Sequence, residues 1–417
     1  MLGFARPFSG RSALVTSTVA LLALTAGCSG GADAAGGDNS QLVIGFALSQ
    51  SGNMAPFDVE PGNAAQLRIK EINDAGGING KKIKVISKDV RSSPDTVGTA
   101  ATELIAEGIN LLVTPCDFDL SAPGASVAQA AKIPSVSICA GDPKMADTKT
   151  LGDYVFSANA GSDVEGSSGA EWAYHKGWHT AYVLQDESIE YTKSAGRYFQ
   201  AKFKELGGKV LGEDAFPGGD NVNISSQATR LKSLAVKPDF VYVASWNPGG
   251  ATAIRQLRAA GVTLPIVGPA ALDGQVLLDV VGGKAGDIYY TGFACYVYCK
   301  GAGSAGLDSF VKDYQAAYKA APSSGYALLG YNMVSAIADA AGKATSFSGG
   351  DLKSALEADG SVKTPIGDVA YFSKSCHKII DMPMTVVRVA NGAMTFAGQQ
   401  RVDSIPGVGD GNSCAAS

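Results

Sequence analysis

Aromatic and acidic side chains gather in six short segments, each of which directly follows an apolar run. The segments are "SQSGNMAPFD", "CDFDLSAPG", "CAGDPKM", "QDESIEYTK", "SWNPGG" and "PAALDGQ". The aromatic members are Phe57, Phe118, Tyr191 and Trp246, and the acidic members are Asp117, Asp119, Asp186 and Asp273. Flat rings bury the body of a small organic molecule, and carboxylates accept hydrogen bonds from its N–H and O–H groups. Any one of these residues is about as often a helix cap or a packing residue, but the six segments together predict a small-solute site.

The residue patterns that catalysis requires do not occur at these positions. The chain has no G-x-S-x-G sequence, and its three histidines lie at a predicted helix end or near the C-terminus. No predicted strand is followed by G-x-G-x-x-G, which disfavours a dinucleotide enzyme. Zinc is disfavoured because His175 and His179 flank Gly177 at a predicted helix end, and Cys376 with His377 is the only other Cys/His neighbour pair. We expect a binding protein without metal or cofactor, and not an enzyme.

Strand-like and helix-like segments alternate along the first third of the chain. Apolar runs begin at Leu42, Lys82, Ile109 and Ile133, and helical spacing follows over residues 64–73, 93–108 and 122–131. Such alternation predicts right-handed βαβ units and a parallel sheet that is covered on both faces. Ligands of these sheets bind beyond the carboxyl ends of the strands, where all six segments lie.

The same alternation restarts beyond Phe156 and then changes after Ala294, where two long helices over 308–320 and 326–343 precede β-rich segments. We expect two Rossmann-like α/β lobes whose later elements dock on both, so that the chain crosses between them several times and forms a hinge. The predicted boundaries are 42–158 with 295–372 for lobe 1, 159–294 with 373–402 for lobe 2, and 403–417 for a C-terminal tail.

The N-terminus has the features of an export signal. Arg6 and Arg11 precede an apolar stretch that ends in "LTAGC", which matches a bacterial lipobox. We therefore expect residues 1–27 to be removed, Cys28 to be lipidated, and residues 28–41 to form a flexible tether to the extracytoplasmic face of the cell membrane. The mature chain would carry 32 basic and 39 acidic residues, a net charge of −7 without any basic cluster, which argues against nucleic acid as a partner.

The other six of the seven cysteines would lie outside the cytoplasm, where disulfides persist. Six cysteines allow 15 pairings. Cys116 and Cys139 end runs that we expect to be neighbouring parallel strands, about 4.8 Å apart, so we predict a bond between them. Closeness in sequence favours Cys295 with Cys299, which leaves Cys376 for Cys414.

Four stretches carry a resemblance to a known family: "IGFALSQSGNMAPF", "EINDAGGINGKKIKVISKD", "QDESIEYTKSAG" and "RQLRAAGVTLPIVGP". The chain resembles the type I periplasmic solute-binding proteins of ABC importers, specifically those similar to the leucine/isoleucine/valine-binding protein. The resemblance implies two lobes joined by three crossings, closure on a small-molecule solute, and delivery to an ABC permease with its ATPase. A ligand-sensing protein of the same fold that feeds a receptor is the alternative, which neighbouring genes would distinguish.

The resemblance also implies which residues bind the solute. Phe57, Tyr191 and Trp246 stand at the family's aromatic positions, whereas the family's small hydroxyl residues correspond here to Phe118, Asp119 and Gly141. A glutamate that takes an amino acid's ammonium group is replaced by Ala270, and Asp273 is the nearest substitute. Acids beside a carboxylate repel it by about 1 kcal/mol or more, so an amino acid, an amide or a hydrophobic or aromatic compound all stay open. The expected ligand-binding set is Phe57, Asp117, Phe118, Asp119, Ala140, Gly141, Tyr191, Trp246 and Asp273.

Overall fold

The computed structural model describes residues 40–219, 221–284, 286–295, 299–300, 305–358, 360–379, 381–409 and 414. Residues 34–417 belong to one compact unit. The predicted signal peptide, Cys28 and most of the predicted tether lie outside the described residues and stay predictions. Within the described ranges, no helix is long and apolar enough to cross a membrane.

The first sheet has five parallel strands in the order β2-β1-β3-β4-β5. The strands are β1 Val43–Leu48, β2 Lys84–Asp89, β3 Leu111–Thr114, β4 Ser135–Ser137 and β5 Val155–Ser157. The helices that connect them are α1 Ala55–Asp74, α2 Pro94–Ala106 and α3 Phe118–Ala130, and the 3-10 helix η1 Pro143–Ala146 precedes β5. This confirms the predicted βαβ units.

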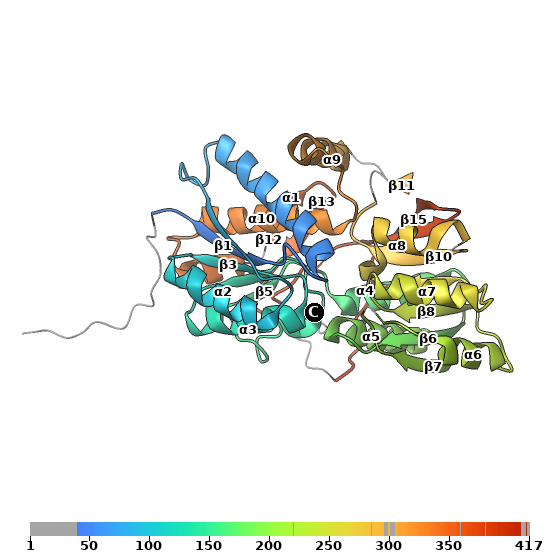
Figure 1. Ribbon diagram of the computed structural model, residues 1–417. Coiled ribbons are helices and arrows are strands. Elements are labelled where there is room, and N and C mark those ends of the chain that lie inside the picture. Colours follow the sequence, from blue (N-terminus) through green and yellow to red (C-terminus); the bar gives the residue numbers. More distant parts are fainter. Residues whose placement is uncertain are drawn as a thin grey trace, which may run out of the picture. The chain divides into compact units, whose positions relative to one another are not determined.

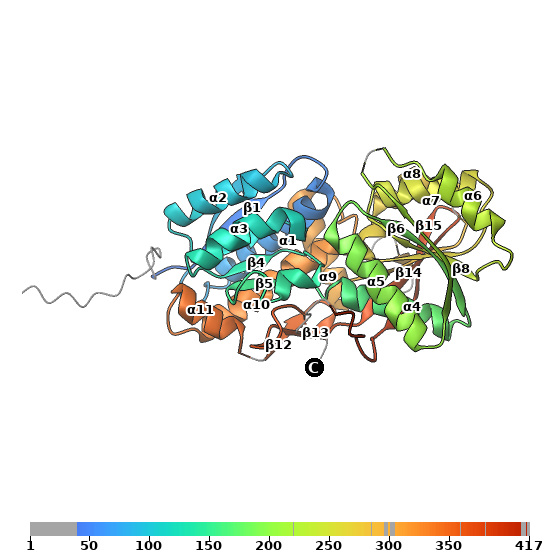
Figure 2. The same ribbon diagram turned by 90° about the horizontal axis from the view of Figure 1, so that it is seen from below.

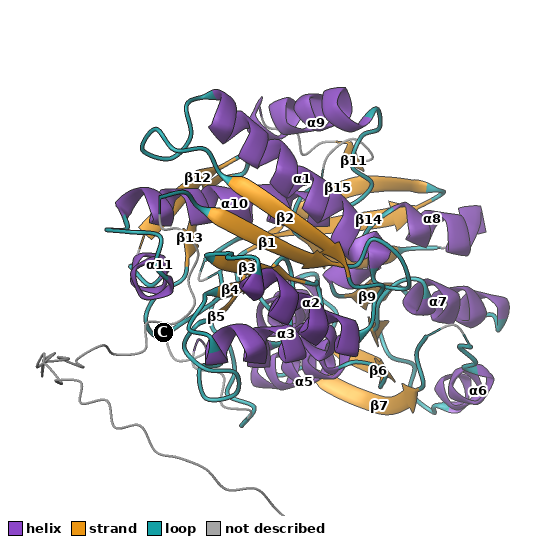
Figure 3. Cartoon of the chain, turned by 60° about the vertical axis from the view of Figure 1, so that its left-hand side comes forward, coloured by secondary structure: helices purple, strands orange, loops and turns teal. Residues whose placement is uncertain are grey.

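Alternate side chains of β1 enter two different cores, as the two-residue period of a strand requires. Ile44 and Phe46 pack in the core that includes Ile69 of α1, whereas Ala47 packs with Val97 of α2. Figure 3 shows β1, β2 and β3 side by side, with α1 on one side of the strands and α2 and α3 on the other. Because helices cover both faces of the sheet, polar side chains that could contact a ligand are expected in the loops at the strand ends.

The second sheet has the order β11-β15-β14-β10-β9-β8-β6-β7. Its strands are β6 Thr180–Asp186, β7 Lys209–Phe216, β8 Phe240–Ala244, β9 Ile266–Gly268, β10 Ile288–Gly292, β11 Cys299–Lys300, β14 Met384–Ala390 and β15 Ala393–Gln400. Strands β6 to β10 pair in parallel, whereas β14 pairs antiparallel with both β10 and β15.

Helices cover both faces of the second sheet (Figure 1). They are α4 Ser162–His175, α5 Glu190–Glu205, α6 Ser225–Ser233, α7 Gly249–Ala259 and α8 Gln275–Val281, with the 3-10 helices η2 Ala270–Leu272 and η3 Gly282–Lys284. Val183 packs with Phe199 of α5 on one face, and Leu184 packs with Ile254 of α7 on the other. The second lobe is therefore built on the same plan as the first.

The chain passes between the two lobes three times. It leaves the first sheet after β5, returns after β10 to form α9 Ala305–Tyr318, α10 Tyr326–Lys343 and α11 Gly349–Leu356, and leaves again after the β12–β13 hairpin, Gly360–Thr364 with Gly367–Tyr371. Figure 2 shows α10, α11 and the hairpin beside the first sheet, and β14 and β15 within the second. The α/β fold with two lobes and a three-crossing hinge is confirmed, while the residue boundaries of the lobes stay a prediction.

Two ion pairs are buried in the second lobe and its hinge. Lys202 and Glu171 lie 3.1 Å apart with side chains that are 3% and 0% exposed, and Glu171 also accepts a hydrogen bond from the backbone of Asp403. Lys378 contacts both carboxylate oxygens of Asp163 at 2.6 Å. Because a buried charge needs a partner, these pairs hold the late segments of the chain on the earlier ones.

Candidate functional site

A cavity of about 290 Å³, partly open to solvent, lies where loops after the strands of both sheets meet. It is lined by Met54, Phe57, Cys116, Asp117, Cys139, Gly141, Ile189, Tyr191, Trp246, Ala271 and Tyr326. All but Tyr326 follow the carboxyl end of a parallel strand, and Tyr326 begins α10. Five of the nine residues expected to bind ligand therefore line one cavity: Phe57, Asp117, Gly141, Tyr191 and Trp246.

Four aromatic side chains form most of the apolar wall. The ring centroid of Phe57 lies 5.9 Å from that of Trp246 and 5.3 Å from that of Tyr326, the second pair edge to face. Phe57 comes from the first turn of α1, whereas Trp246 follows β8 of the second sheet. These contacts bring rings from both lobes together, which lets each lobe contribute to one binding site.

Asp117 is the acidic residue of the cavity wall. It caps α3, because its Oδ1 accepts a hydrogen bond of 3.0 Å from the backbone N–H of Leu120. Its side chain is buried, and burial together with the charge of Asp119 raises the pKa of the Asp117 carboxyl to about 7. None of the lining residues in the described part of the chain is Lys, Arg or His, so the described cavity wall contributes no basic side chain.

A second buried acid, Glu165, lies behind Tyr191. The Tyr191 hydroxyl contacts Glu165 Oε2, which also accepts a 3.0 Å hydrogen bond from the Ala270 N–H. Glu165 Oε1 has no hydrogen-bond partner among the described residues. Burial raises the pKa of Glu165 to about 8. The sequence analysis did not single out Glu165, because an acid in the first turn of a helix is usually explained by its favourable interaction with the helix dipole.

Gly141 allows the two lobes to approach closely beside the cavity. A Cβ atom at this position would lie 2.8 Å from two ring atoms of Tyr191, closer than side chains tolerate. Any larger residue at 141 would therefore displace the Tyr191 ring. This explains why a glycine stands at the end of the loop that follows β4.

The disulfide between Cys116 and Cys139 joins two of the lining loops. The structure contains this bond, with a Cα separation of 4.4 Å, and β3 and β4 are neighbouring parallel strands as expected. The Asp58 carboxylate accepts the Cys116 N–H and the Ser49 N–H, both at 2.7 Å. Asp58 is buried, and burial raises its pKa to about 7. The loops after β1 and β3 are thus fixed to each other next to the cavity.

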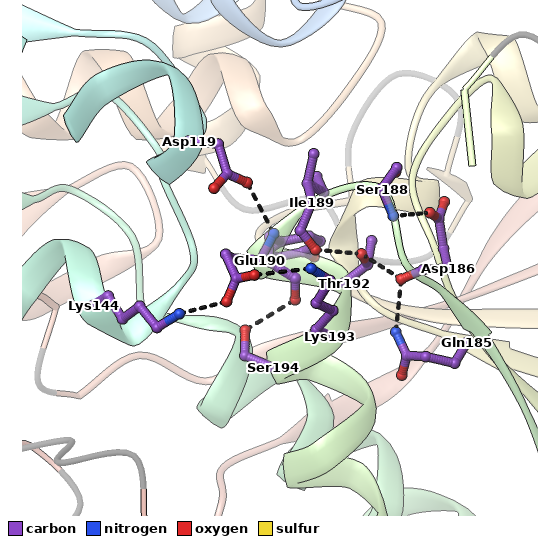
Figure 4. A network of polar contacts seen from close by, with 11 residues as sticks. Asp119, Lys144, Gln185, Asp186, Ser188, Ile189, Glu190, Thr192, Lys193 and Ser194 are labelled. Atoms are coloured by element: carbon purple, nitrogen blue, oxygen red, sulfur yellow. Dashed lines mark hydrogen bonds and ion pairs between the residues drawn. The ribbon is translucent and has the colours of Figure 1, made fainter. Parts of the chain in front are cut away.

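Phe118 and Asp119 lie outside the cavity lining, and Asp119 contacts the second lobe. Asp119 Oδ2 accepts a 2.9 Å hydrogen bond from the Glu190 N–H, and Lys144 pairs with the Glu190 carboxylate (Figure 4). Lys144 also lies 5.7 Å from the centroid of the Phe118 ring. The pairs with Lys144 and then Lys193 lower the pKa of Glu190 to about 2, so this contact persists across the physiological pH range.

Asp273 and Ala140 are not among the residues that line the cavity. Asp273 accepts hydrogen bonds from the Tyr290 hydroxyl at 2.5 Å and from the Gly325 N–H at 2.6 Å, and burial raises its pKa to about 6. Ala140 is buried, and its N–H donates to Ser137 Oγ at 2.8 Å. Both residues hold neighbouring loops through these hydrogen bonds, and their part in solute binding stays a prediction.

The remaining cysteines agree with the predicted pairing as far as they are described. Cys376 is bonded to Cys414, as expected. Cys295 is also disulfide-bonded, but the side chain of its expected partner, Cys299, lies outside the description. The described residues contain no group of three His, Cys, Asp or Glu side chains that could hold a metal ion.

Comparison with known proteins agrees with this architecture. The chain matches the periplasmic binding protein family over residues 41–393. It is 24% identical over 340 residues to Leu/Ile/Val-binding protein homolog 1 of Brucella abortus (strain 2308). The aligned region covers 82% of this chain and 88% of that protein.

Two solved structures are similar to it in fold. One is a branched-chain amino acid transporter substrate-binding protein of Streptococcus pneumoniae in complex with isoleucine (TM-score 0.73, 24% identity, 87% of this chain and 99% of that one). The other is a solute-binding protein of an ABC transporter from Rhodopseudomonas palustris BisB5 in complex with 3,4-dihydroxybenzoic acid (TM-score 0.74, 20% identity, 88% and 99%). With two α/β lobes, three crossings and a match over most of its length, the chain belongs to the periplasmic binding protein family.

Proposed function

We propose that this protein captures a small organic solute between its two lobes and delivers it to an ABC permease with its ATPase. The observation that carries the proposal is the aromatic cavity, because its wall is made by strand-end loops of both sheets. We propose further that Cys28 is lipidated and holds the protein at the extracytoplasmic face of the membrane. The protein acts by binding, without catalysis.

Lobe closure supplies the mechanism. A ligand shifts the population toward the closed state only as far as it binds that state more tightly than the open one. Phe57 and Asp117 belong to the first lobe, whereas Tyr191 and Trp246 belong to the second, so a solute that touches all four gains its full contacts only when the lobes meet. A permease can then distinguish the closed, loaded protein from the open one.

The chemistry of the wall favours a solute with a flat or branched apolar body. Two similar structures contain isoleucine and 3,4-dihydroxybenzoic acid, which are small organic molecules. We therefore propose a compact amino acid, amide or aromatic compound as the solute class.

A thermal-shift screen followed by calorimetry tests the proposal. A solute at 100 times its Kd stabilises the protein by about 2.7 kcal/mol, which such a screen detects. We expect Tyr191→Ala and Trp246→Ala each to weaken binding by about 1 to 3 kcal/mol through lost aromatic burial. Trp178→Ala is the matched control, because Trp178 packs on Phe240 away from the cavity. Unchanged affinity in both site variants would place the site elsewhere.

Delivery and anchoring need cellular experiments. Deletion of the gene should abolish uptake of the solute that the screen identifies, whereas normal uptake and a lost response to that solute would indicate sensing instead. Cys28→Ala should release the protein from the membrane fraction, and a membrane-bound Cys28→Ala protein would contradict lipid anchoring.

A further inference from the structure

We propose that the solute is an organic ammonium ion whose cationic group lies between the Asp117 carboxylate and the aromatic side chains of the cavity. This inference rests on the proposed function and narrows the solute class that it leaves open. Three features of the described residues support it: the aromatic wall, the acidic nature of the ionisable groups beside the cavity, and the aspartates bound at the starts of three nearby helices.

The aromatic wall matches the way proteins bind organic cations. Phe57, Tyr191, Trp246 and Tyr326 all line the cavity, and each is at most 6% exposed. A cation within about 6 Å of an aromatic centroid is attracted by the negative face of the ring, and the attraction grows when both partners are removed from water. Rings from both lobes would thus contact the same cationic group upon closure.

The ionisable side chains that line the cavity or contact its wall are acidic. Asp117 lines it, and Glu165 contacts Tyr191, which is itself a lining residue. Two lysines of the described segments have carboxylate partners: Lys144 pairs with Glu190, and Lys378 pairs with Asp163. A carboxylate solute would bury its charge against Asp117 without a basic side chain in the cavity wall, whereas a cation would offset that charge.

Aspartates already accept backbone N–H groups at the starts of three helices that begin next to lining residues, α3, α5 and α10. Such N-termini are natural binding sites for anions. Asp117 accepts the Leu120 N–H in the first turn of α3, Asp119 accepts the Glu190 N–H at the start of α5, and Asp273 accepts the Gly325 N–H at the start of α10.

The hydrogen bond to Asp119 measures 2.9 Å, and the one to Asp273 measures 2.6 Å. The chain's own carboxylates therefore take positions that a solute carboxylate would otherwise use. A solute that brings its own positive charge is favoured at such a site.

Three compounds of matched shape test the charge directly: benzylamine, benzyl alcohol and benzoate, each titrated by calorimetry at pH 8. We expect benzylamine to bind at least about tenfold more tightly than the other two, which corresponds to about 1.4 kcal/mol. Asp117→Asn should remove that preference, whereas Asp95→Asn, which removes the same charge from an exposed position on α2, should preserve it. Tighter binding of benzoate than of benzylamine would overturn the proposal.

The outcomes separate this inference from the proposed function. Binding of benzoate or of an uncharged solute that depends on Tyr191 and Trp246 would keep the function and refute the ammonium ion. No binding of any compound in the wider screen would refute the function itself. If Asp117→Asn does not fold, the wild-type protein still decides, because affinity for benzylamine should rise between pH 6 and pH 8 as Asp117 ionises. A flat pH profile would count against the proposal.

Discussion

Removal of the Cys116–Cys139 bond should lower stability and solute affinity together. The bond closes a loop with a sequence separation of 23 residues. The chain-entropy relation gives about 3.4 kcal/mol of stabilisation at 25 °C for a loop of that length. Cys139 is buried and packs in the first-lobe core, so Cys116→Ala with Cys139→Ala should lower the free energy of unfolding by at least about 3 kcal/mol.

Urea unfolding under oxidising conditions measures this change, and calorimetry measures affinity for the solute found in the screen. Both cysteines line the cavity, so loosening their loops should weaken binding by about 1 kcal/mol, or roughly fivefold. The control is Cys376→Ala with Cys414→Ala, since neither residue lines the cavity. This variant removes the bond that closes a loop with a sequence separation of 38 residues, and it should lose about 4 kcal/mol of stability without a change in affinity.

Two results would refute this reasoning. A stability loss below about 1 kcal/mol for the Cys116 and Cys139 variant would mean that the bond does not restrict the unfolded chain as its loop length requires. Equal losses of affinity in both double variants would mean that global stability, and not the position of the two loops, controls binding.

Three further changes address the charges described above. Asp58→Asn should cost about 2 to 4 kcal/mol, because one of two backbone N–H groups loses its acceptor. Burial raises the Asp58 pKa from 3.8 to about 7, so the stability that protonated Asp58 contributes falls as pH rises from about 4 to 7, by up to about 1.4 kcal/mol per pH unit. Urea unfolding across that range should show a smaller fall in the free energy of unfolding for the variant than for the wild type. An equal fall would contradict the assignment. Lys144→Met should weaken solute binding about two- to fivefold in calorimetry, whereas Lys193→Met, which removes a partner of Glu190 within the same helix, should not; equal effects would refute a role in closure. Lys202→Met should lower thermal stability by about 3 to 5 kcal/mol, because it leaves Glu171 buried without its cation, and a loss below about 1 kcal/mol would contradict this.

The fold was predictable because its repeating units are local. Alternation of apolar runs and helical spacing defines each βαβ unit within about 30 residues, and right-handed crossovers then determine how the strands assemble. Helix boundaries were less predictable. Residues 122–131 were expected to form the third helix, but α3 begins at Phe118, because Asp117 caps it and Pro123 is accommodated inside.

The site was predictable where residues follow strands directly, and less so where they do not. Phe57, Tyr191 and Trp246 reach the cavity because the carboxyl ends of parallel strands point to one edge. Tyr326 reaches it from a helix that follows a crossing between lobes, and no local pattern indicates where such a helix starts relative to the sheets. The sequence also carried no sign that Tyr290 and the Gly325 N–H, both distant from Asp273 in sequence, bind its carboxylate.

The antiparallel pairing of β14 with β10 constrains how the polypeptide reaches its native state. β10 ends at Gly292 and β14 begins at Met384, so the inner edge of β10 lacks its partner while the intervening residues are synthesised. An unpaired apolar strand edge recruits strands from other molecules. A nascent or truncated chain that stops before residue 384 should therefore self-associate, and holding the polypeptide unfolded until that strand has emerged avoids this outcome.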